Sequence, residues 1–227
     1  QSLKVNESRS WKEQHDYEQI DSRKDFVSYR NLDKFSTEYQ QKKLIEWQAY
    51  AKELQKRDDL ILFYDYNTQE DWSRTLKNRA AAGSSDGAII GCRWSEGRWK
   101  GKGALEFKNI SDRIKLNLPG TYSAMTMACW VRIDSFDRWL SSLLLTDDYN
   151  PNELHWQLSD SGEMILGTYS PRGAQNHFSK AVIGPEYLGR WVHLAVVFDP
   201  IKMQVTQYLN AKAVYNGKLK NPQKIKL

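Results

Sequence analysis

The chain has 227 residues, among them nine Trp and twelve Tyr, and its net charge is +5 at pH 7. No run approaches the roughly 18 apolar residues that a helix needs to cross a bilayer, which argues against a transmembrane helix in this sequence. The charges of the first half alternate in sign, as in Lys12-Glu13 and Arg23-Lys24-Asp25. Interleaved charge is typical of a solvated face, so we predict no nucleic-acid partner despite the basic balance.

Only two cysteines are present, Cys92 and Cys129, and they do not fix a redox compartment. A disulfide and two free thiols both remain open. No CxxC pair occurs and the four His are scattered along the chain, which argues against a structural zinc site.

The N-terminal part, residues 1–34, is polar and charged, and an amphipathic segment follows it. We interpret 1–34 as the end of a strand of an upstream domain, Gln1–Asn6, followed by a linker that could hold a short helix. Phe35–Arg57 is predicted to be a helix, because Leu44, Trp47, Ala51 and Leu54 recur at helical spacing. A helix of this length needs a surface for its apolar stripe. We expect the helix, 35–58, to pack on the domain that follows; pairing with a partner helix is the alternative.

From Leu60 onward the apolar pattern changes to that of strands. Arg190–Asp199 alternates strictly, and because both of its residue sets are largely apolar we predict a central strand covered on each side. Turn residues follow at short intervals, and we expect hairpin turns at Ser159–Gly162 and at Asn216–Gly217. The pattern predicts a mainly β fold over 59–227, a two-sheet antiparallel jelly-roll sandwich. The expected strands are Leu60–Tyr66, Ala88–Trp94, Ala104–Lys108, Arg113–Leu118, Met125–Asp134, Leu143–Thr146, His155–Leu158, Met164–Tyr169, Arg190–Asp199 and Gln204–Leu209.

Three of these stretches carry a family resemblance. In their order and separation, Gly103–Phe107 (GALEF), Met125–Val131 (MTMACWV) and Trp191–Val196 (WVHLAV) resemble the laminin-G-like branch of the concanavalin A-like lectin/glucanase superfamily. The resemblance covers about three quarters of the chain and implies the same sandwich. One departure stands at Ala211, where the family usually has Gly in a hairpin turn. Because a left-handed Ala costs about 1 kcal/mol, we expect another turn geometry there.

A narrower resemblance joins the chain to FecR-domain proteins. Asp59–Asn67, Gly97–Phe107 and Arg138–Leu158 are similar to the C-terminal region of these sensor or anti-sigma-like proteins, and Gln1–Val5 is similar to the closing strand of the FecR domain. This resemblance implies a membrane-anchored signalling protein whose FecR domain and membrane span lie upstream. It also implies an extracytoplasmic location, in the periplasm or at the cell surface.

The sequence argues against catalysis. Glycoside hydrolysis needs two carboxylates about 5–10 Å apart on one cleft. The pattern that supplies them, acids at alternate positions of one strand, is absent from this sequence, and no G-x-S-x-G, P-loop or H-E-x-x-H motif occurs. We therefore predict that the chain is not an enzyme.

Carbohydrate binding is favoured by the density of rings and polar side chains between Trp139 and Trp156. Sugars stack their apolar faces on aromatic rings while polar side chains read their hydroxyls. Trp130, Trp156 and Trp191 lie inside predicted strands and are expected to pack in the core or on a sheet surface. The candidate ligand-binding residues are Trp139, Asp147, Asp148, Tyr149, His155, Tyr169, Arg172 and His177.

No cofactor other than calcium is expected. Asp147 and Asp148, with the neighbouring Asn side chains, form an oxygen-rich segment of the kind that Ca²⁺ prefers, and laminin-G-like domains often hold calcium at a rim. A solvated turn is the plainer interpretation of the same residues.

The sequence thus favours a non-catalytic recognition module that binds a glycan or another surface polymer. A structural or protein-interaction domain without a glycan site is the alternative. Either function is compatible with a protein partner. Contact with the membrane is expected only through the upstream segment.

Overall fold

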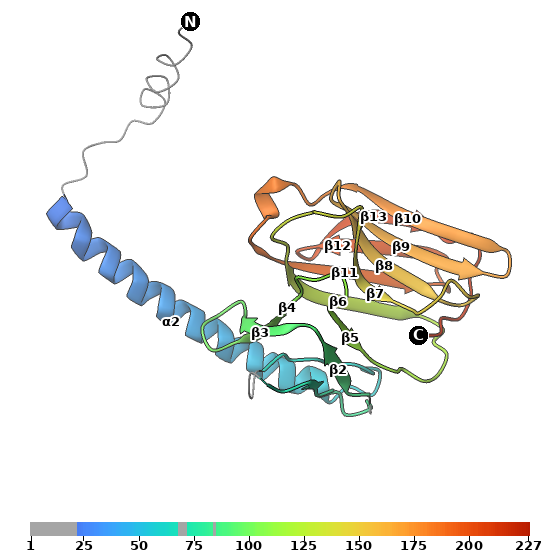
Figure 1. Ribbon diagram of the computed structural model, residues 1–227, viewed down its shortest axis with the longest axis horizontal. Helices are drawn as coiled ribbons and strands as arrows, with labels where there is room; N and C mark the ends of the chain where they lie inside the picture. Colours follow the sequence, from blue (N-terminus) through green and yellow to red (C-terminus); the bar gives the residue numbers. More distant parts are fainter. Residues whose placement is uncertain (1–21, 68–71, 84) are drawn as a thin grey trace, which may run out of the picture. The chain divides into compact units, whose positions relative to one another are not determined.

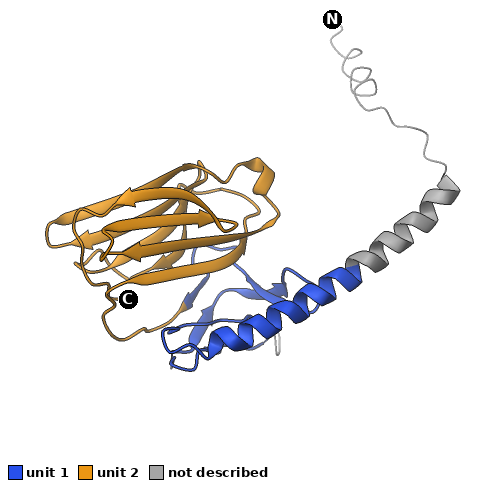
Figure 2. Ribbon diagram, turned by 180° about the vertical axis from the view of Figure 1, so that it is seen from behind, with its two compact units in different colours: residues 1–114 blue, residues 115–227 orange. Residues whose placement is uncertain are grey.

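The computed structural model describes the backbone of residues 22–67, 72–83 and 85–227, and the side chains of these ranges from Thr37 onward (Figure 1). The strand end predicted at Gln1–Val5 lies outside the described residues. The chain forms two compact units, 1–114 and 115–227 (Figure 2). This division differs from the sequence-based boundary at 58/59, because the strands between 75 and 114 group with the helix.

Helix α2 (Ser22–Gln55) is longer than predicted. It begins thirteen residues before Phe35, so the helix that the linker could hold is the first part of α2. This stretch contains no Gly or Pro that would end a helix, and its Arg, Lys and Leu residues are good helix formers. The apolar stripe is confirmed where side chains are described: Ala51 is buried and Leu44, Trp47 and Leu54 are half-buried.

The first unit contains two small sheets. One has the order β1-β2-β5, from Thr75–Leu76, Gly87–Ile90 and Arg113–Lys115, and the other pairs β3 (Arg93–Glu96) with β4 (Gly103–Glu106). A single strand over Ala88–Trp94 was wrong, because Gly91 takes a left-handed φ of 78° and separates β2 from β3.

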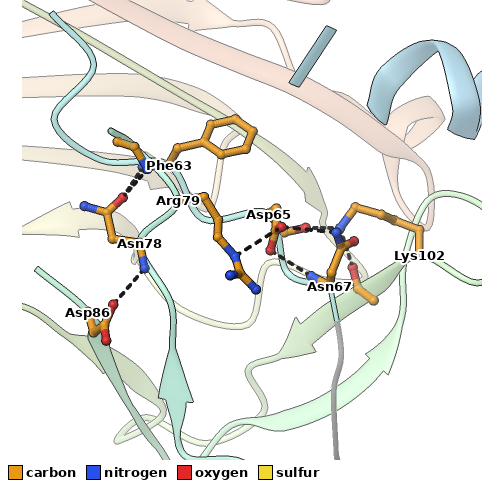
Figure 3. A network of polar contacts seen from close by, with 9 residues as sticks. Phe63, Asp65, Asn67, Asn78, Arg79, Asp86 and Lys102 are labelled. Atoms are coloured by element: carbon orange, nitrogen blue, oxygen red, sulfur yellow. Dashed lines mark hydrogen bonds and ion pairs between the residues drawn. The ribbon is translucent and has the colours of Figure 1, made fainter. Parts of the chain in front are cut away.

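The segment Leu60–Tyr66 was predicted to be a strand and is not one. Only an isolated bridge joins Tyr64 to Asn78. The side chain of Asn78 replaces a neighbouring strand here. Its Oδ1 accepts from the Phe63 N–H at 2.9 Å (Figure 3). Its Nδ2 donates to the Ile61 carbonyl at 3.0 Å.

The stripe of α2 packs on the turn that joins β3 to β4. The ring centroids of Trp47 and Trp99 are 6.2 Å apart, and the ammonium of Lys102 lies 4.8 Å from the Trp47 ring centroid. This ammonium also donates to the backbone carbonyl of Asp65, whose carboxylate faces Arg79 at 3.6 Å (Figure 3). Burial lowers the pKa of Lys102 to about 8.

The second unit is an antiparallel sandwich of two four-stranded sheets, with the orders β13-β12-β11-β6 and β10-β9-β8-β7. After β6 the chain crosses to the other sheet, forms four consecutive strands there, passes through a short 3₁₀ turn and returns (Figure 1). This confirms the predicted mainly β sandwich with an N-terminal helix. The strands are β6 (Met125–Arg132), β7 (Leu140–Leu145), β8 (Leu154–Ser159), β9 (Glu163–Ser170), β10 (Gly173–Ala181), β11 (Trp191–Asp199), β12 (Gln204–Leu209) and β13 (Lys212–Lys218).

The core lies between these two sheets and follows the period-two pattern. From β11, Val192, Leu194, Val196 and Phe198 are fully buried. Strand β11 is central, between β12 and β6, as predicted. Its other residue set is less covered than expected, because Trp191, His193 and Val197 are only half-buried. The facing sheet contributes Leu154, Trp156, Leu158, Met164 and Leu166.

The hairpin between β12 and β13 turns at Asn210-Ala211, not at Asn216-Gly217, which lies inside β13. Asn210 has φ 49° and Ala211 has φ 65°, the two left-handed residues of a primed two-residue turn. The expected change of turn geometry at Ala211 is therefore wrong: Ala occupies the left-handed position that glycine would fill at lower cost.

Candidate functional site

The sheet β10-β9-β8-β7 has an outer face whose side chains alternate with those of the core. Strand register arranges this outer face in rows across the four strands. One row contains Leu145, His155, Gly167 and Asn176. The next row contains Ser142, Gln157, Ile165 and Phe178. Tyr169 and Ala174 follow beyond the first row, next to the β7–β8 loop (146–153).

Three rings meet at this end of the outer face, and we call them the ring cluster: Tyr149, His155 and Tyr169. The centroid of Tyr149 lies 4.5 Å from that of His155 and 5.1 Å from that of Tyr169, and the latter two are also 5.1 Å apart. All three pairs meet edge to face, the arrangement in which the positive edge of one ring meets the negative face of another. Tyr149 is 66% exposed while His155 is only 3% exposed. The cluster therefore presents a ring to solvent on a buried base.

The β7–β8 loop is fixed in place from below. His155 Nε2 lies 3.0 Å from the carbonyl oxygen of Asp148 and 3.1 Å from Thr146 Oγ1. Because a carbonyl oxygen can only accept, Nε2 carries the proton. The carboxylate of Glu153 accepts from the Asn150 N–H at 2.9 Å and from Thr146 Oγ1 at 3.1 Å. These contacts hold the backbone on either side of Tyr149.

The other ring nitrogen of His155 is a distinctive feature of the cluster. Nδ1 is buried and has no hydrogen-bond partner among the described residues. Since Nε2 is the protonated nitrogen, Nδ1 is a bare acceptor. A buried acceptor without a hydrogen-bond donor costs about 1–3 kcal/mol. The ring cluster therefore has a polar atom beneath it that lacks a donor.

Tyr169 folds back along its own strand over Gly167. A Cβ added to Gly167 would lie 3.2 Å from the Tyr169 hydroxyl oxygen and 3.0 Å from Asn176 Oδ1. Glycine thus leaves room for both side chains on the outer face. Burial raises the pKa of the Tyr169 phenol above its ordinary value, so the group keeps its hydroxyl proton at neutral pH.

The structure brings together most of the residues that the sequence nominated. Tyr149, His155 and Tyr169 form the ring cluster, and Asp147 and Asp148 lie in the loop beside it. Arg172 lies in the β9–β10 turn at the same end of the sheet, since the Asn152 N–H donates to the carbonyl of Tyr169 near the end of β9.

Trp139 does not join this cluster. It precedes β7 at the opposite end of the strand, where its carbonyl accepts from the Asp160 N–H at 3.0 Å. A six-residue strand is about 20 Å long, so Trp139 and the β7–β8 loop are separated by the whole length of β7. Its side chain is 75% exposed.

His177 was nominated for the surface and lies inside the sandwich instead. Register pairs it with the core residue Leu166, and its Nδ1 lies 3.2 Å from the hydroxyl of Tyr215. Burial lowers the pKa of His177. The strand that carries it, β10, was not predicted, so the face to which His177 belongs could not be assigned.

The outer face also has residues that sequence reasoning missed: Asn176 and Phe178 on β10, and Gln157 on β8. Asn176 is exposed and Phe178 is 48% exposed. The segment that carries them is polar and lacks the β-branched residues that signal a strand. No regular alternation of apolar and polar residues marks this segment, so only its pairing with β9 places these side chains on the outer face.

The loop acids fit calcium poorly. Asp148 Oδ1 already accepts from the Tyr149 N–H, the Asp148 carbonyl accepts from His155, and Glu153 is bound to Asn150 and Thr146. In the described part of the chain, no three His, Cys, Asp or Glu side chains gather as metal ligands. Calcium at Asp147 and Asp148 stays a prediction.

The two cysteines, whose pairing the sequence left open, are free thiols. Cys92 is buried in the first unit and Cys129 lies on β6 of the second. Burial raises the pKa of Cys129 to about 12, which keeps it protonated and unreactive.

In the described ranges no helix is both long and apolar enough to cross a membrane. Two of the solved structures that resemble the chain carry sugar-related descriptions. One is a "putative carbohydrate binding protein" from Bacteroides ovatus, at 14% identity and a TM-score of 0.37, with 61% of this chain and 33% of that chain covered. The chain thus spans a third of that protein's length.

The other is domain 4 of AbnA, a GH43 extracellular arabinanase from Geobacillus stearothermophilus, in complex with arabinotriose. Its identity is 18% and its TM-score 0.45, with 62% of this chain and 68% of that chain covered. No curated protein matches the chain. A family model described as "Concanavalin A-like lectin/glucanases superfamily" matches residues 108–226. This match spans more than half of the sequence, and the chain therefore belongs to the concanavalin A-like lectin/glucanases superfamily.

Proposed function

We propose that the second unit binds carbohydrate without catalysis, through the outer face of the sheet β10-β9-β8-β7. The observation that carries this proposal is the ring cluster, in which Tyr149 is exposed to solvent and braced by His155 and Tyr169. A ring held in one orientation offers a flat apolar surface on which a sugar face stacks, and little side-chain entropy is lost on binding.

Polar side chains that could read hydroxyls lie next to the cluster. Asn176 is exposed in the row that contains His155, and its amide both donates and accepts. Gln157 lies in the adjacent row, where its Nε2 donates to Ser142 Oγ at 3.3 Å. Aromatic side chains with a few polar groups beside them are typical of ligand-binding sites.

Binding rather than hydrolysis is favoured by the charges of this face. The two central rows contain no Asp or Glu. Glu153, in the adjoining loop, is engaged by Asn150 and Thr146. Glycoside hydrolysis needs one free acid and one free nucleophile or base on the same cleft.

The experiment is a polysaccharide and glycan-array screen with the wild-type chain, Tyr149→Ala and Trp139→Ala. Both substitutions remove an exposed ring from the same unit, and only Tyr149 belongs to the ring cluster. We expect Tyr149→Ala to lose binding to the glycans that the wild-type chain binds, and Trp139→Ala to keep it. Absence of binding to every polymer, together with capture of a protein partner, would favour the interaction domain. Release of reducing sugar from a bound polymer would contradict a non-catalytic role.

We further propose that the chain is the C-terminal, extracytoplasmic part of a FecR-type regulatory protein. The support is the similarity of Asp59–Asn67, Gly97–Phe107 and Arg138–Leu158 to that class. In such a protein a bound polymer outside the membrane would be the signal. The full reading frame tests this proposal: it should encode a FecR-like domain and a membrane span before Gln1.

A further inference from the structure

The outer face carries a second exposed ring, far from the ring cluster. Phe178 on β10 is 48% exposed and is paired with Ile165 of β9. Ile165 and Tyr169 are four residues apart on the same strand. At about 3.4 Å per residue, the positions of Ile165 and Tyr169 along β9 are about 14 Å apart. This separation exceeds the length of a disaccharide.

The surface between the two aromatic positions is polar but uncharged. Asn176 and Ser142 are exposed and Gln157 is half-buried. The two rows that contain them have no Asp, Glu, Lys or Arg side chain. The nearby charges lie beyond the two rows, at both ends of this surface. At the loop end they are Asp147, Asp148, Glu153 and Arg172, and beyond Phe178 they are Glu163 of β9 and the exposed Lys180 of β10.

Charge and spacing together restrict the ligand. An acidic polysaccharide would place carboxylates or sulfates on amide groups that cannot neutralise them, whereas a neutral one loses nothing by desolvation there. A single sugar or a disaccharide would use one aromatic position and leave the other unoccupied. Only an oligosaccharide or polysaccharide longer than a disaccharide reaches both the ring cluster and Phe178 while its hydroxyls contact the amides between them.

We propose that the outer face takes a linear, neutral polysaccharide longer than a disaccharide, with Phe178 as a second stacking position. This inference rests on the proposed function and adds the class and length of the ligand. Tyr149 and Tyr169 stack on one end of the bound segment of the polysaccharide. Asn176 and Gln157 bind hydroxyls in its middle, and Phe178 stacks on a sugar at its other end.

The test is isothermal titration calorimetry with cello-, xylo- and manno-oligosaccharides of two and six residues. A hexamer of galacturonic acid serves as the charged counterpart. For a series that binds, we expect the hexamer to bind about tenfold more tightly than the dimer, a gain of about 1.4 kcal/mol. Phe178→Ala should abolish this gain, so that the hexamer binds about as tightly as the dimer. Tyr149→Ala should weaken both. Asn176→Ala, at an exposed position, is a second probe that should weaken the hexamer, and Trp139→Ala is the matched control.

The inference is overturned if the dimer binds as tightly as the hexamer, if Phe178→Ala and Asn176→Ala both bind hexamers like the wild type, or if the galacturonate hexamer binds as well as the neutral ones. The proposed function fails in a different way. In that case no oligosaccharide or polymer binds, or Tyr149→Ala has no effect on those that do.

Discussion

His155 Nε2 donates to the backbone carbonyl of Asp148 across 3.0 Å, and the ring of the same histidine lies 4.5 Å from that of Tyr149. One buried side chain thus holds both the backbone of the β7–β8 loop and the exposed ring that the loop presents. This makes His155 a positioning residue for the proposed sugar surface, because it acts through Tyr149 rather than on the ligand.

We expect His155→Phe to lower the free energy of unfolding by about 1 kcal/mol. Phe keeps a ring in the cluster but removes the donor to Asp148 and Thr146, and removal of the unpaired Nδ1 offsets only part of that loss. Urea denaturation followed by Trp fluorescence measures the change. Ser142→Ala, an exposed neighbour on the same face, is the control and should stay within about 0.5 kcal/mol of the wild type. Equal stability of His155→Phe and wild type would show that the hydrogen bond does not hold the loop.

The turn Asn210-Ala211 offers a stabilising substitution. Ala211 has φ 65°, which costs an L residue with a Cβ about 1–2 kcal/mol, while glycine pays only its greater chain entropy. We expect Ala211→Gly to raise the free energy of unfolding by up to about 1 kcal/mol. The matched control is Ala213→Gly in β13, which should be destabilising because strands disfavour glycine. Thermal unfolding of the two variants gives opposite shifts of Tm, and shifts of the same sign would refute the argument.

His177 should make the stability of the sandwich pH-dependent. Its pKa is lowered by burial from the ordinary 6.5, so the unfolded chain takes up the proton first as the pH falls. Its contribution is complete above pH 6.5 and is lost as the pH falls from there through the folded-state pKa. We expect the wild type to lose more stability between pH 7.5 and pH 5 than His177→Gln. Parallel pH profiles of the two proteins, measured by urea denaturation, would contradict this assignment.

Lys102 should act at the alkaline end, in the first unit. Its pKa is lowered to about 8 by burial, against 10.5 in the unfolded chain. Between these values the unfolded chain holds more protons, so stability should rise with pH as the folded ammonium deprotonates. We expect wild type to gain stability between pH 7.5 and pH 9.5 relative to Lys102→Met, which keeps the packing under Trp47 but does not titrate. Fluorescence-monitored urea unfolding compares the two, and an equal pH response would show that Lys102 is solvated.

Much of the second unit could be read from local pattern. Strict alternation in β6 and β11 follows directly from one buried and one outward side, so the strands and their core residues are visible without a structure. The ring cluster was partly visible as well, because Tyr149 and His155 stand close together in a stretch rich in rings and polar groups. The family resemblance placed these stretches in a sandwich.

Other features depended on partners distant in the sequence. Strand β10 has few residues that favour strands, and pairing with β9 creates it and decides that His177 points inward while Asn176 and Phe178 point outward. Leu60–Tyr66 looks like a strand, yet the Asn78 side chain takes the place of a neighbour. The chain sequence by itself determined the period of each element and therefore its buried side. Only the tertiary structure decided which outward side chains share a surface, because strand register is set between segments that the sequence keeps far apart.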